Sequence, residues 1–252
     1  MNQQPIEKQH LNEDVPIARR TVDVHSVFFT IQGEGPFVGT PSVFVRLAGC
    51  NLQCPLCDTD YTSSRFQVTP EALEDCVATV QRDVGGKVIG KAPLVVITGG
   101  EPFRQDITFH VWALLDAGYQ VQIETNGTLF IRDFPYDRVT VVCSPKTGKI
   151  NAQLLPHITA LKYVIRAGEV MDDGLPVNAL GHAAHPRVAR PPQGFKGTVY
   201  VQPVDEAAVP HTPGHVMLPS DPYQRNLAAA IRSAMAFGYT LGVQLHKIIG
   251  KE

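Results

Sequence analysis

The sequence predicts an α/β fold, an incomplete TIM-like barrel with parallel strands and outer helices. Two observations carry this prediction: apolar strands alternate with helical segments, and strand after strand ends in a polar or glycine-rich group. Parallel strands place their carboxyl ends on one rim, and in α/β barrels that rim holds the active site. The length of 252 residues is common for one domain of this kind.

Composition narrows the range of partners. The formal net charge is −2, with 18% charged and 44% hydrophobic residues, so bulk electrostatics indicates neither a nucleic-acid surface nor a membrane surface. No apolar run approaches the roughly 20 residues that span a bilayer, and residues 1–20 are polar without a signal-peptide core. We expect a flexible tail over 1–20, a single core domain over 21–252, and a reducing, cytoplasmic compartment.

The elements of the predicted barrel can be placed in chain order. The run 94–98 is continuously apolar, as a strand buried on both faces should be. Thr69, Pro70 and Glu71 form a helix-start signal, with threonine as the N-cap and proline at the first position. We predict strands over 21–30, 42–47, 94–98, 121–123, 139–143, 161–165, 198–201 and 241–245, and helices from 70 to the glycine pair 85–86, over 107–117 and over 222–237.

The stretch 172–197 breaks the alternation of strands and helices. It is rich in proline and glycine, so we interpret it as a long loop or insertion. We expect its two histidines, His182 and His185, to be surface residues rather than metal ligands.

Three of the five cysteines stand close together. Cys50, Cys54 and Cys57 have the spacing C-x3-C-x2-C. A fourth cysteine would complete a structural zinc site or an ordinary electron-transfer cluster. Three thiolates leave one iron of a [4Fe–4S] cluster open to another ligand, and an open iron is a place for chemistry.

Other interpretations of these cysteines compete with a cluster. They could be ordinary buried residues, although their neighbours have a loop composition. They could be half of a zinc site, but Cys76 and Cys143 lie in apolar element-like contexts where we expect core residues. Disulfides are disfavoured by the odd number of cysteines and the lack of a secretion signal.

Two further features allow both a plain and a functional interpretation. The loop over 31–36 is punctuated by two glycines and carries a glutamine and a glutamate. A simple turn explains it, while its amide and carboxylate would also suit a polar heterocycle. Arg46, late in the strand 42–47, could be a surface ion-pair partner, or it could hold a carboxylate through two parallel hydrogen bonds.

These motifs occur in one order that resembles a known family. The cysteine loop, the runs TGGEP (98–102), ETNGT (124–128) and SPK (144–146), and the loop IQGEG (31–35) together resemble the 7-carboxy-7-deazaguanine synthases, which are radical S-adenosylmethionine (SAM) enzymes. The closing QLHK (244–247) also looks like the end of that family. The cysteine and GGEP motifs are typical of the whole radical SAM superfamily. The resemblance to this particular family depends on QGEG, the pair Asp58–Thr59 and SPK.

The resemblance implies a fold, a reaction and a set of partners. The fold is the partial barrel of the radical SAM type. The reaction turns 6-carboxy-5,6,7,8-tetrahydropterin into 7-carboxy-7-deazaguanine with loss of ammonia, in queuosine and related 7-deazapurine biosynthesis. The cofactors are a [4Fe–4S] cluster, SAM and Mg2+. The partners are the small pterin, a flavodoxin or ferredoxin as reductant, and a second copy in a homodimer.

The resemblance also implies site residues, and no side chain is expected to act as an acid, base or nucleophile. The position just before the third cysteine departs from the family pattern, because many relatives have an aromatic residue there and this chain has Leu56. The implied contacts are Cys50, Cys54 and Cys57 for the cluster; Thr59 for Mg2+; Asp58, Gly100, Glu124, Ser144, Pro145, Lys146, Gln202, Pro203, Val204 and Asp205 for SAM; and Ile31, Gln32, Gly33, Glu34, Arg46 and Thr98 for the pterin.

Two rival functions stay open at this point. An activase that makes a glycyl radical on a partner protein would share the cysteine spacing and the barrel, but it would need a protein-docking surface. A non-catalytic iron–sulfur or zinc module is a different class, and the three-cysteine count and the polar strand ends speak against it. Cleavage of SAM separates both enzymes from the module, and pterin turnover separates the two enzymes.

Overall fold

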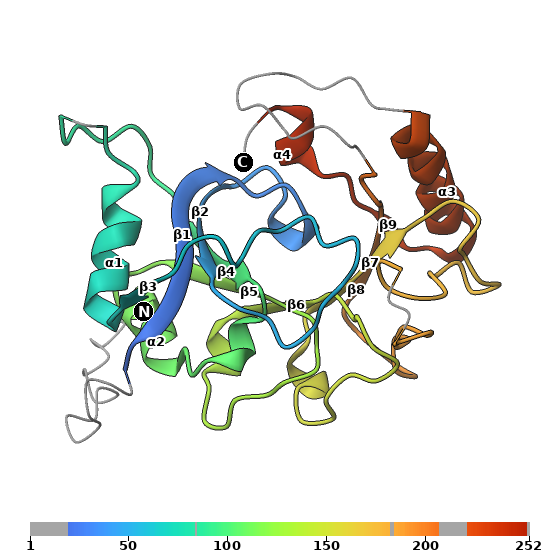
Figure 1. Ribbon diagram of the computed structural model, residues 1–252, viewed down its shortest axis with the longest axis horizontal. Coiled ribbons are helices and arrows are strands. Elements are labelled where there is room, and N and C mark those ends of the chain that lie inside the picture. The colour runs from blue at the N-terminus through green and yellow to red at the C-terminus, as the bar shows by residue number, and fades with distance from the viewer. Residues whose placement is uncertain (1–19, 84, 182–183, 207–220, 251–252) are drawn as a thin grey trace, which may run out of the picture.

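The computed structural model has one open sheet of nine strands in the order β3-β1-β2-β4-β5-β6-β7-β8-β9 (Figure 1). The structure describes residues 20–83, 85–181, 184–206 and 221–250, so the predicted tail lies outside the described residues except for Arg20. From β2 to β9 all neighbouring strands are parallel, which confirms the predicted partial barrel. The strands are β1 (Val22–Ile31), β2 (Pro41–Leu47), β3 (Phe66–Val68), β4 (Leu94–Gly99), β5 (Gln120–Thr125), β6 (Thr140–Cys143), β7 (Ala160–Ile165), β8 (Thr198–Pro203) and β9 (Thr240–Leu241).

The first strand departs from the parallel pattern. β1 is antiparallel to β2, and Ile31 pairs with Pro41. The cause is the short connection 32–40, because a parallel crossover needs a dozen residues or more. The loop after β1 therefore leaves the sheet at the amino end of β2, opposite the end that carries the cysteine loop. It still reaches the site, because it folds across the inner face of the sheet toward β7.

Within the described residues, the sheet is accompanied by four α-helices: α1 (Pro70–Thr79), α2 (Thr108–Asp116), α3 (Asp221–Phe237) and α4 (Leu245–Ile248). α1 begins as predicted, with the Thr69 side chain accepting a hydrogen bond from the Ala72 N–H at 3.3 Å. It ends at Thr79 rather than near the glycine pair, and Arg82 and Val88 then form an isolated antiparallel bridge. α1 and α2 lie beside β1, whereas α3 lies at the far end beside β8 and β9 (Figure 1).

The core lies between the sheet and these helices. The positions of β2 and β4 that face the helices, such as Val43, Val45, Val95 and Ile97, are almost fully buried. They pack with Leu73 and other apolar residues of the helices in one continuous cluster. Cys143 is fully buried in that cluster, as expected for a core residue.

The chain ends differently from the prediction. The predicted strand over 241–245 is shorter and earlier, since β9 covers only Thr240 and Leu241, and Leu245 begins the helix α4. The reason is tertiary: the Leu245 N–H donates to the Gly33 carbonyl at 3.1 Å, so the chain turns toward the loop after β1 instead of continuing along β8.

The connection between β7 and β8 contains the stretch 172–197. Its described residues include no helix or strand, apart from an isolated bridge between Val170 and Pro176. Arg190 ties the stretch together through an ion pair with Asp173 at 2.6 Å. His182 lies outside the described residues.

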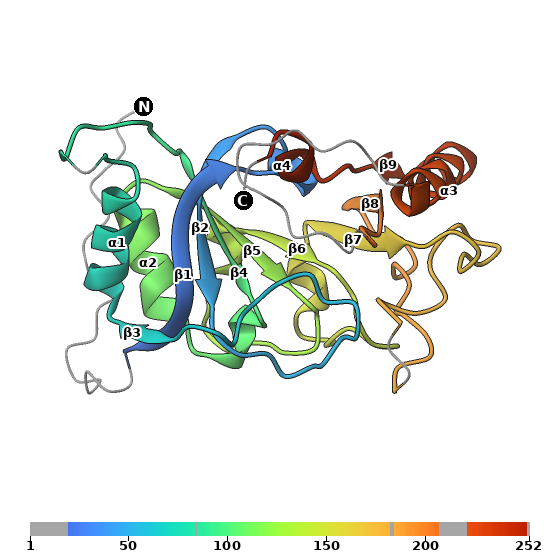
Figure 2. The same cartoon turned by 45° about the horizontal axis from the view of Figure 1, so that its top comes forward.

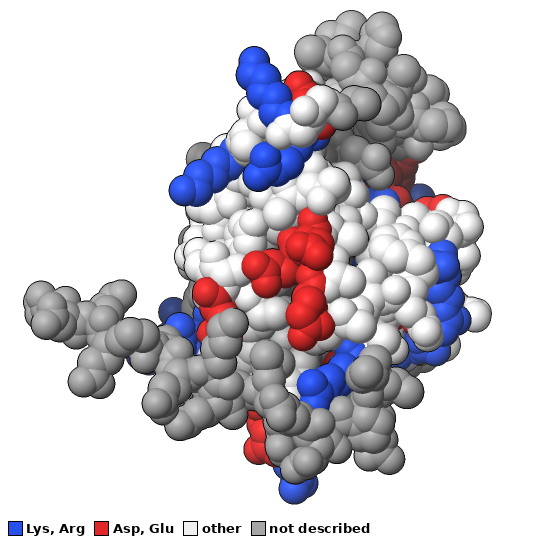
Figure 3. All heavy atoms as spheres, turned by 90° about the vertical axis from the view of Figure 1, so that its left-hand side faces the viewer, with Lys and Arg blue, Asp and Glu red and all other residues white. Residues whose placement is uncertain are grey.

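The outer face formed by α1 carries charge but no part of the cavity. Glu71, Glu74 and Asp75 are exposed on this helix, and acidic side chains gather along the middle of the face in Figure 3. None of these three residues lines the large cavity described below. The segment between β2 and β3, which includes the cysteines, instead crosses in front of β4, β5 and β6 (Figures 1 and 2). No helix among the described residues is long and apolar enough to cross a membrane.

Candidate active site

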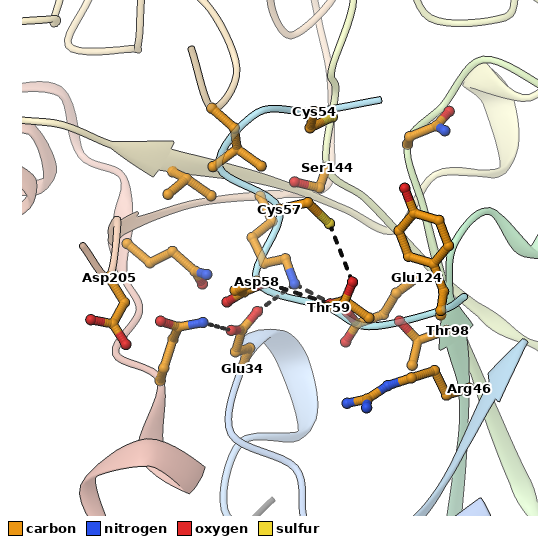
Figure 4. Close-up of a pocket in the computed structure, with 18 of the residues that line it drawn as sticks. Glu34, Arg46, Cys54, Cys57, Asp58, Thr59, Thr98, Glu124, Ser144 and Asp205 are labelled. Carbon is orange, nitrogen blue, oxygen red and sulfur yellow. Dashed lines mark hydrogen bonds and ion pairs between the residues drawn. The ribbon is translucent and has the colours of Figure 1, made fainter. Parts of the chain in front are cut away.

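A cavity of about 570 Å3 opens on the inner face of the sheet, beneath the cysteine loop. Figure 4 shows Cys54 and Cys57 at one side of it and Glu34 and Arg46 at the other. All the site residues predicted from the sequence line this cavity except Gly33 and Pro145. Segments far apart in the sequence thus converge on one space, as the polar strand ends predicted.

Backbone packing fixes the position of the cysteine loop. The Glu101 N–H donates to the Gly49 carbonyl at 3.1 Å. A Cβ on Gly100 would meet that same carbonyl oxygen at 1.9 Å, so only glycine lets the end of β4 lie this close. Asn51 adds a side-chain link, because its Oδ1 accepts a hydrogen bond from the Asn126 amide at 2.9 Å.

Glu101 is a buried anchor for the same region. Its Oε1 accepts hydrogen bonds from the Thr125 hydroxyl at 2.6 Å and the Phe103 N–H at 3.1 Å, and its Oε2 accepts one from the Asn126 N–H at 2.7 Å. Burial raises the pKa of this carboxyl above its usual value. The glutamate of the GGEP motif therefore joins the ends of β4 and β5 and does not face the cavity.

The three thiols of the cysteine loop are suited to an iron–sulfur cluster. All three are free and line the cavity, while Cys76 is on α1 and Cys143 is in the core. Burial raises the pKa of both Cys50 and Cys54, the charge of Lys146 opposes this at Cys54, and thiolate charge on the neighbouring cysteines adds to it. Bound iron would supply the positive charge that stabilises all three thiolates.

The number of thiols in the cavity bears on the kind of metal centre. Three cysteines line it, while Cys76 and Cys143 do not. Among the described residues no group of three His, Cys, Asp or Glu side chains is placed to hold a single metal ion. A donor set of three thiols fits a [4Fe–4S] cluster with one open iron, and a zinc site would need a fourth soft ligand that no cysteine in the cavity supplies.

A buried ion-pair network forms the opposite side of the cavity. The Lys162 ammonium on β7 contacts the carboxylate of Glu34 and lies 3.1 Å from that of Glu124 on β5. The Gln244 amide donates to Glu34 at 2.7 Å, and the Gln32 amide donates to Glu124 at 3.1 Å. The loop after β1, the strands β5 and β7 and the C-terminal segment are therefore joined in one network around Lys162.

Arg46 and Thr98 are neighbours because β2 and β4 are in parallel register. Both line the cavity, and Figure 4 shows their side chains side by side. The Arg46 guanidinium lies over the Phe28 ring, 5.1 Å from its centroid, and Phe28 stacks on Phe44. The aromatic pair positions the Arg46 guanidinium beside the Thr98 hydroxyl, and a cation next to a hydroxyl suits a carboxylate ligand.

Apart from Pro145, the SAM residues predicted at the ends of β6 and β8 also line the cavity. Lys146 donates a hydrogen bond from its ammonium to the Ser144 hydroxyl at 2.7 Å. Burial and the charge of Lys162 lower the pKa of Lys146. The Gln202 Oε1 is buried and has no hydrogen-bond partner in the described structure. An orphaned acceptor at the wall of a cavity fits a ligand that brings hydrogen-bond donors.

Sequence reasoning missed several residues of this site. Lys162 stands in a strand that looked simply apolar, although a lysine inside a buried run is itself a signal. His246 and Lys247 belong to the closing QLHK motif, which by itself predicts no role for either side chain. Lys247 bridges Asp58 at 2.9 Å and Asp205 at 3.1 Å. The cavity-lining residues without a predicted role also include Asn126, Tyr61, Leu180 and Gln244.

Gly33 has a packing role in this structure. A Cβ at this position would lie 1.9 Å from the Nδ1 of His246. The glycine therefore lets the imidazole of α4 pack directly against the loop after β1. The His246 ring itself reaches the cavity.

Comparison with known proteins gives the same family that the motifs suggested. The chain is 47% identical to a 7-carboxy-7-deazaguanine synthase from Rhodospirillum rubrum over 229 residues, covering 90% of this chain and 91% of that protein. It is 37% identical to the 7-carboxy-7-deazaguanine synthase of Rickettsia prowazekii, covering 92% and 89%. No protein-family model matches the sequence.

A solved structure shares the fold. The crystal structure of QueE from Escherichia coli superposes with a TM-score of 0.63, covering 91% of this chain and 96% of that chain at 21% identity. The open parallel sheet and the three-thiol cavity define a radical SAM enzyme. With the close relatives above, the chain belongs to the 7-carboxy-7-deazaguanine synthase family.

Proposed function

We propose that the cavity beneath the cysteine loop is where this chain carries out its family's reaction. That reaction is the ring contraction of 6-carboxy-5,6,7,8-tetrahydropterin to 7-carboxy-7-deazaguanine, with release of ammonia, in queuosine biosynthesis. The observation that carries the proposal is the convergence of residues: with two exceptions, every predicted contact lines one cavity. The cofactors of the family are a [4Fe–4S] cluster and SAM, with Mg2+.

The cofactor end of the cavity is assigned to the cysteine loop and its neighbours. A reduced cluster bound there would supply the one-electron chemistry that cleaves SAM and starts the reaction of the pterin. Cys50, Cys54 and Cys57 hold the cluster, and Thr59 supplies a hard oxygen for Mg2+. The residues that hold SAM are Asp58, Gly100, Glu124, Ser144, Pro145, Lys146 and 202–205. Pro145 does not line the cavity, so it contributes by fixing the positions of Ser144 and Lys146.

The substrate end is assigned to Arg46, Thr98 and the loop after β1. Arg46 holds the pterin carboxylate, since a guanidinium matches a carboxylate with two parallel hydrogen bonds. Glu34 accepts hydrogen bonds from the N–H groups of the pterin ring, and Ile31 and Gln32 flank the ring. The depth of the cavity beneath the loop keeps water from the reacting atoms.

Three further assignments concern partners and compartment. The cluster needs a one-electron donor of low potential, which we assign to a flavodoxin or ferredoxin. We assign a homodimer, which is supported by apolar side chains that α3 exposes on successive turns, Ile231 and Met235; light scattering of the purified protein tests it. The cytoplasm is the assigned compartment, because free thiols persist in a reducing environment.

Anaerobic turnover tests the reaction and the site together. The cluster is reconstituted, SAM, Mg2+, dithionite and 6-carboxytetrahydropterin are added, and products are followed by mass spectrometry. We expect 7-carboxy-7-deazaguanine from the native chain and none from Cys54→Ala. Formation of 5′-deoxyadenosine with untouched pterin would favour the glycyl-radical activase, and an intact reducible cluster that leaves SAM uncleaved would favour a non-catalytic module.

A further inference from the structure

Lys162 is a buried cation to which no motif of the sequence gave a role. It lies in the middle of β7, between apolar residues, and its side chain is only 8% exposed. A lysine is rarely buried this deeply unless it is paired. Its partners therefore indicate what it does.

The ammonium of Lys162 is shared by two carboxylates from different parts of the chain. Glu34 belongs to the loop after β1 and Glu124 to β5, and their side chains are 11% and 17% exposed. Every oxygen of the two carboxylates accepts a hydrogen bond. Glu34 accepts from Lys162 and Gln244, and Glu124 accepts from Lys162, Gln32 and Gln122.

The charges of this group determine its protonation. Burial opposes ionisation of Glu34, but the charges of Lys162 and His246, together with the hydrogen bonds from Lys162 and Gln244, outweigh it and hold the pKa of Glu34 well below its usual range. Burial likewise opposes the charge of Lys162, and the two carboxylates outweigh it and raise its pKa. The other titratable or charged groups facing this network are Arg46 on β2, Asp58 in the cysteine loop, Lys146 after β6, Tyr223 on α3, and His246 and Lys247 on α4.

We propose that Lys162 is a positioning residue whose single ammonium holds the Glu34 and Glu124 carboxylates together and turned into the cavity. One carboxylate serves the pterin and the other serves SAM. This inference rests on the proposed function, because it takes Glu34 as facing the substrate and Glu124 as facing SAM.

The proposed role of Lys162 predicts what happens to the two carboxylates when its ammonium is removed. Two carboxylates that share a buried site without a counter-ion repel one another, so loss of the Lys162 ammonium favours uptake of a proton by Glu34. A protonated carboxyl group accepts fewer hydrogen bonds from ring N–H groups. Binding of the pterin would then depend on pH in a way that it does not when Lys162 is present.

Calorimetric binding of 6-carboxytetrahydropterin tests this without turnover. The protein carries its oxidised cluster, SAM and Mg2+, and no reductant is added. We expect the native chain and Lys162→Arg to have a Kd that is constant within about twofold from pH 6 to 8. In Lys162→Met binding should weaken as the pH falls, with the Kd rising by about tenfold per pH unit below the pH at which Glu34 takes up its proton. Lys149→Met, an exposed lysine, is the matched control and should behave as the native chain.

An infrared measurement gives a readout that needs no ligand. Lys162→Met should show the band of a protonated carboxylic acid at neutral pH, absent from the native chain and from Lys162→Arg. This keeps the inference separate from the proposed function: failure of the native chain to bind pterin would overturn the substrate assignment, while the infrared band still decides the role of Lys162.

A second variant tests the inference in case Lys162→Met does not fold. Lys162→Met/Glu124→Gln removes the repulsion between the two carboxylates but still leaves Glu34 without its cation. We expect the same infrared band in this variant, titrating at lower pH than in Lys162→Met. Pterin binding independent of pH in these variants, together with no protonated carboxyl at neutral pH, would overturn the inference.

Discussion

The two ends of the cavity are built in different ways. At the carboxylate end, all four oxygens of Glu34 and Glu124 accept hydrogen bonds from the chain itself. At the cysteine end, the thiols make weaker sulfur hydrogen bonds, such as the one of 3.4 Å from the Leu52 N–H to the sulfur of Cys50. The cysteine end is held mainly by backbone packing on the end of β4.

This difference shows which end of the cavity has its buried charges neutralised by the protein itself. The carboxylate end is complete as a protein structure, and its cation is part of the fold. The cysteine end carries thiols whose ionisation burial opposes, and their balance comes from bound iron. Substitutions at the two ends should therefore separate stability from cofactor loading.

The largest expected effect on stability comes from the carboxylate end. Lys162→Met leaves two buried carboxylates uncompensated and should lower the free energy of unfolding of the cluster-free protein by about 3–5 kcal/mol. Cys54→Ala changes a half-exposed loop side chain and should cost about 1 kcal/mol or less, although it abolishes cluster loading. Urea titrations of both variants measure this, and equal losses would remove the distinction between the two ends.

The next effect concerns the backbone support of the cysteine loop. A Cβ on Gly100 meets backbone atoms of Gly49 and Cys50, so Gly100→Ala must displace the loop and should cost about 1–3 kcal/mol. Iron content after reconstitution should fall with it. Gly148→Ala is the matched control, because a Cβ there meets only the Arg187 carbonyl at 3.6 Å. If Gly100→Ala keeps full iron loading, the support does not come from this contact.

Local sequence patterns predicted the cysteine end better than the carboxylate end. The thiols and the GGEP run stand close together in sequence or at strand ends, and short-range signals identify such groups. Lys162 was missed because its partners are brought to it only by the assembled sheet, from segments far away in the chain. The meeting of Gly33 with His246 is hidden for the same reason.

The direction of β1 shows a second limit of sequence patterns. Its alternation predicts a strand but not its orientation, and the strand ends in a polar loop like its neighbours. The orientation depends on the length of the connection to β2, which permits only an antiparallel pair. The polar loop after β1 reaches the site nonetheless, because it crosses the inner face and meets Lys162.

The smallest expected effect is the contribution of Glu34 to the free energy of unfolding at acid pH. The pKa of Glu34 is lowered in the folded chain, so its stabilising contribution is full above the unfolded value of about 4.3 and is lost as the pH falls through the folded value. Glu34→Gln cannot take up this proton. Its free energy of unfolding should therefore fall less steeply than that of the native chain between pH 5 and 3, by at most about 1.4 kcal/mol per pH unit.

Chemical unfolding of the cluster-free protein at a series of pH values measures this slope. Glu74→Gln changes an exposed carboxylate on α1 and should keep the native slope. A native slope in Glu34→Gln would mean that Glu34 takes up its proton at the same pH in the folded and the unfolded chain. Lys162 would then not hold the Glu34 carboxylate in its charged form, and the contrast between a self-balanced carboxylate end and an iron-balanced cysteine end would no longer hold.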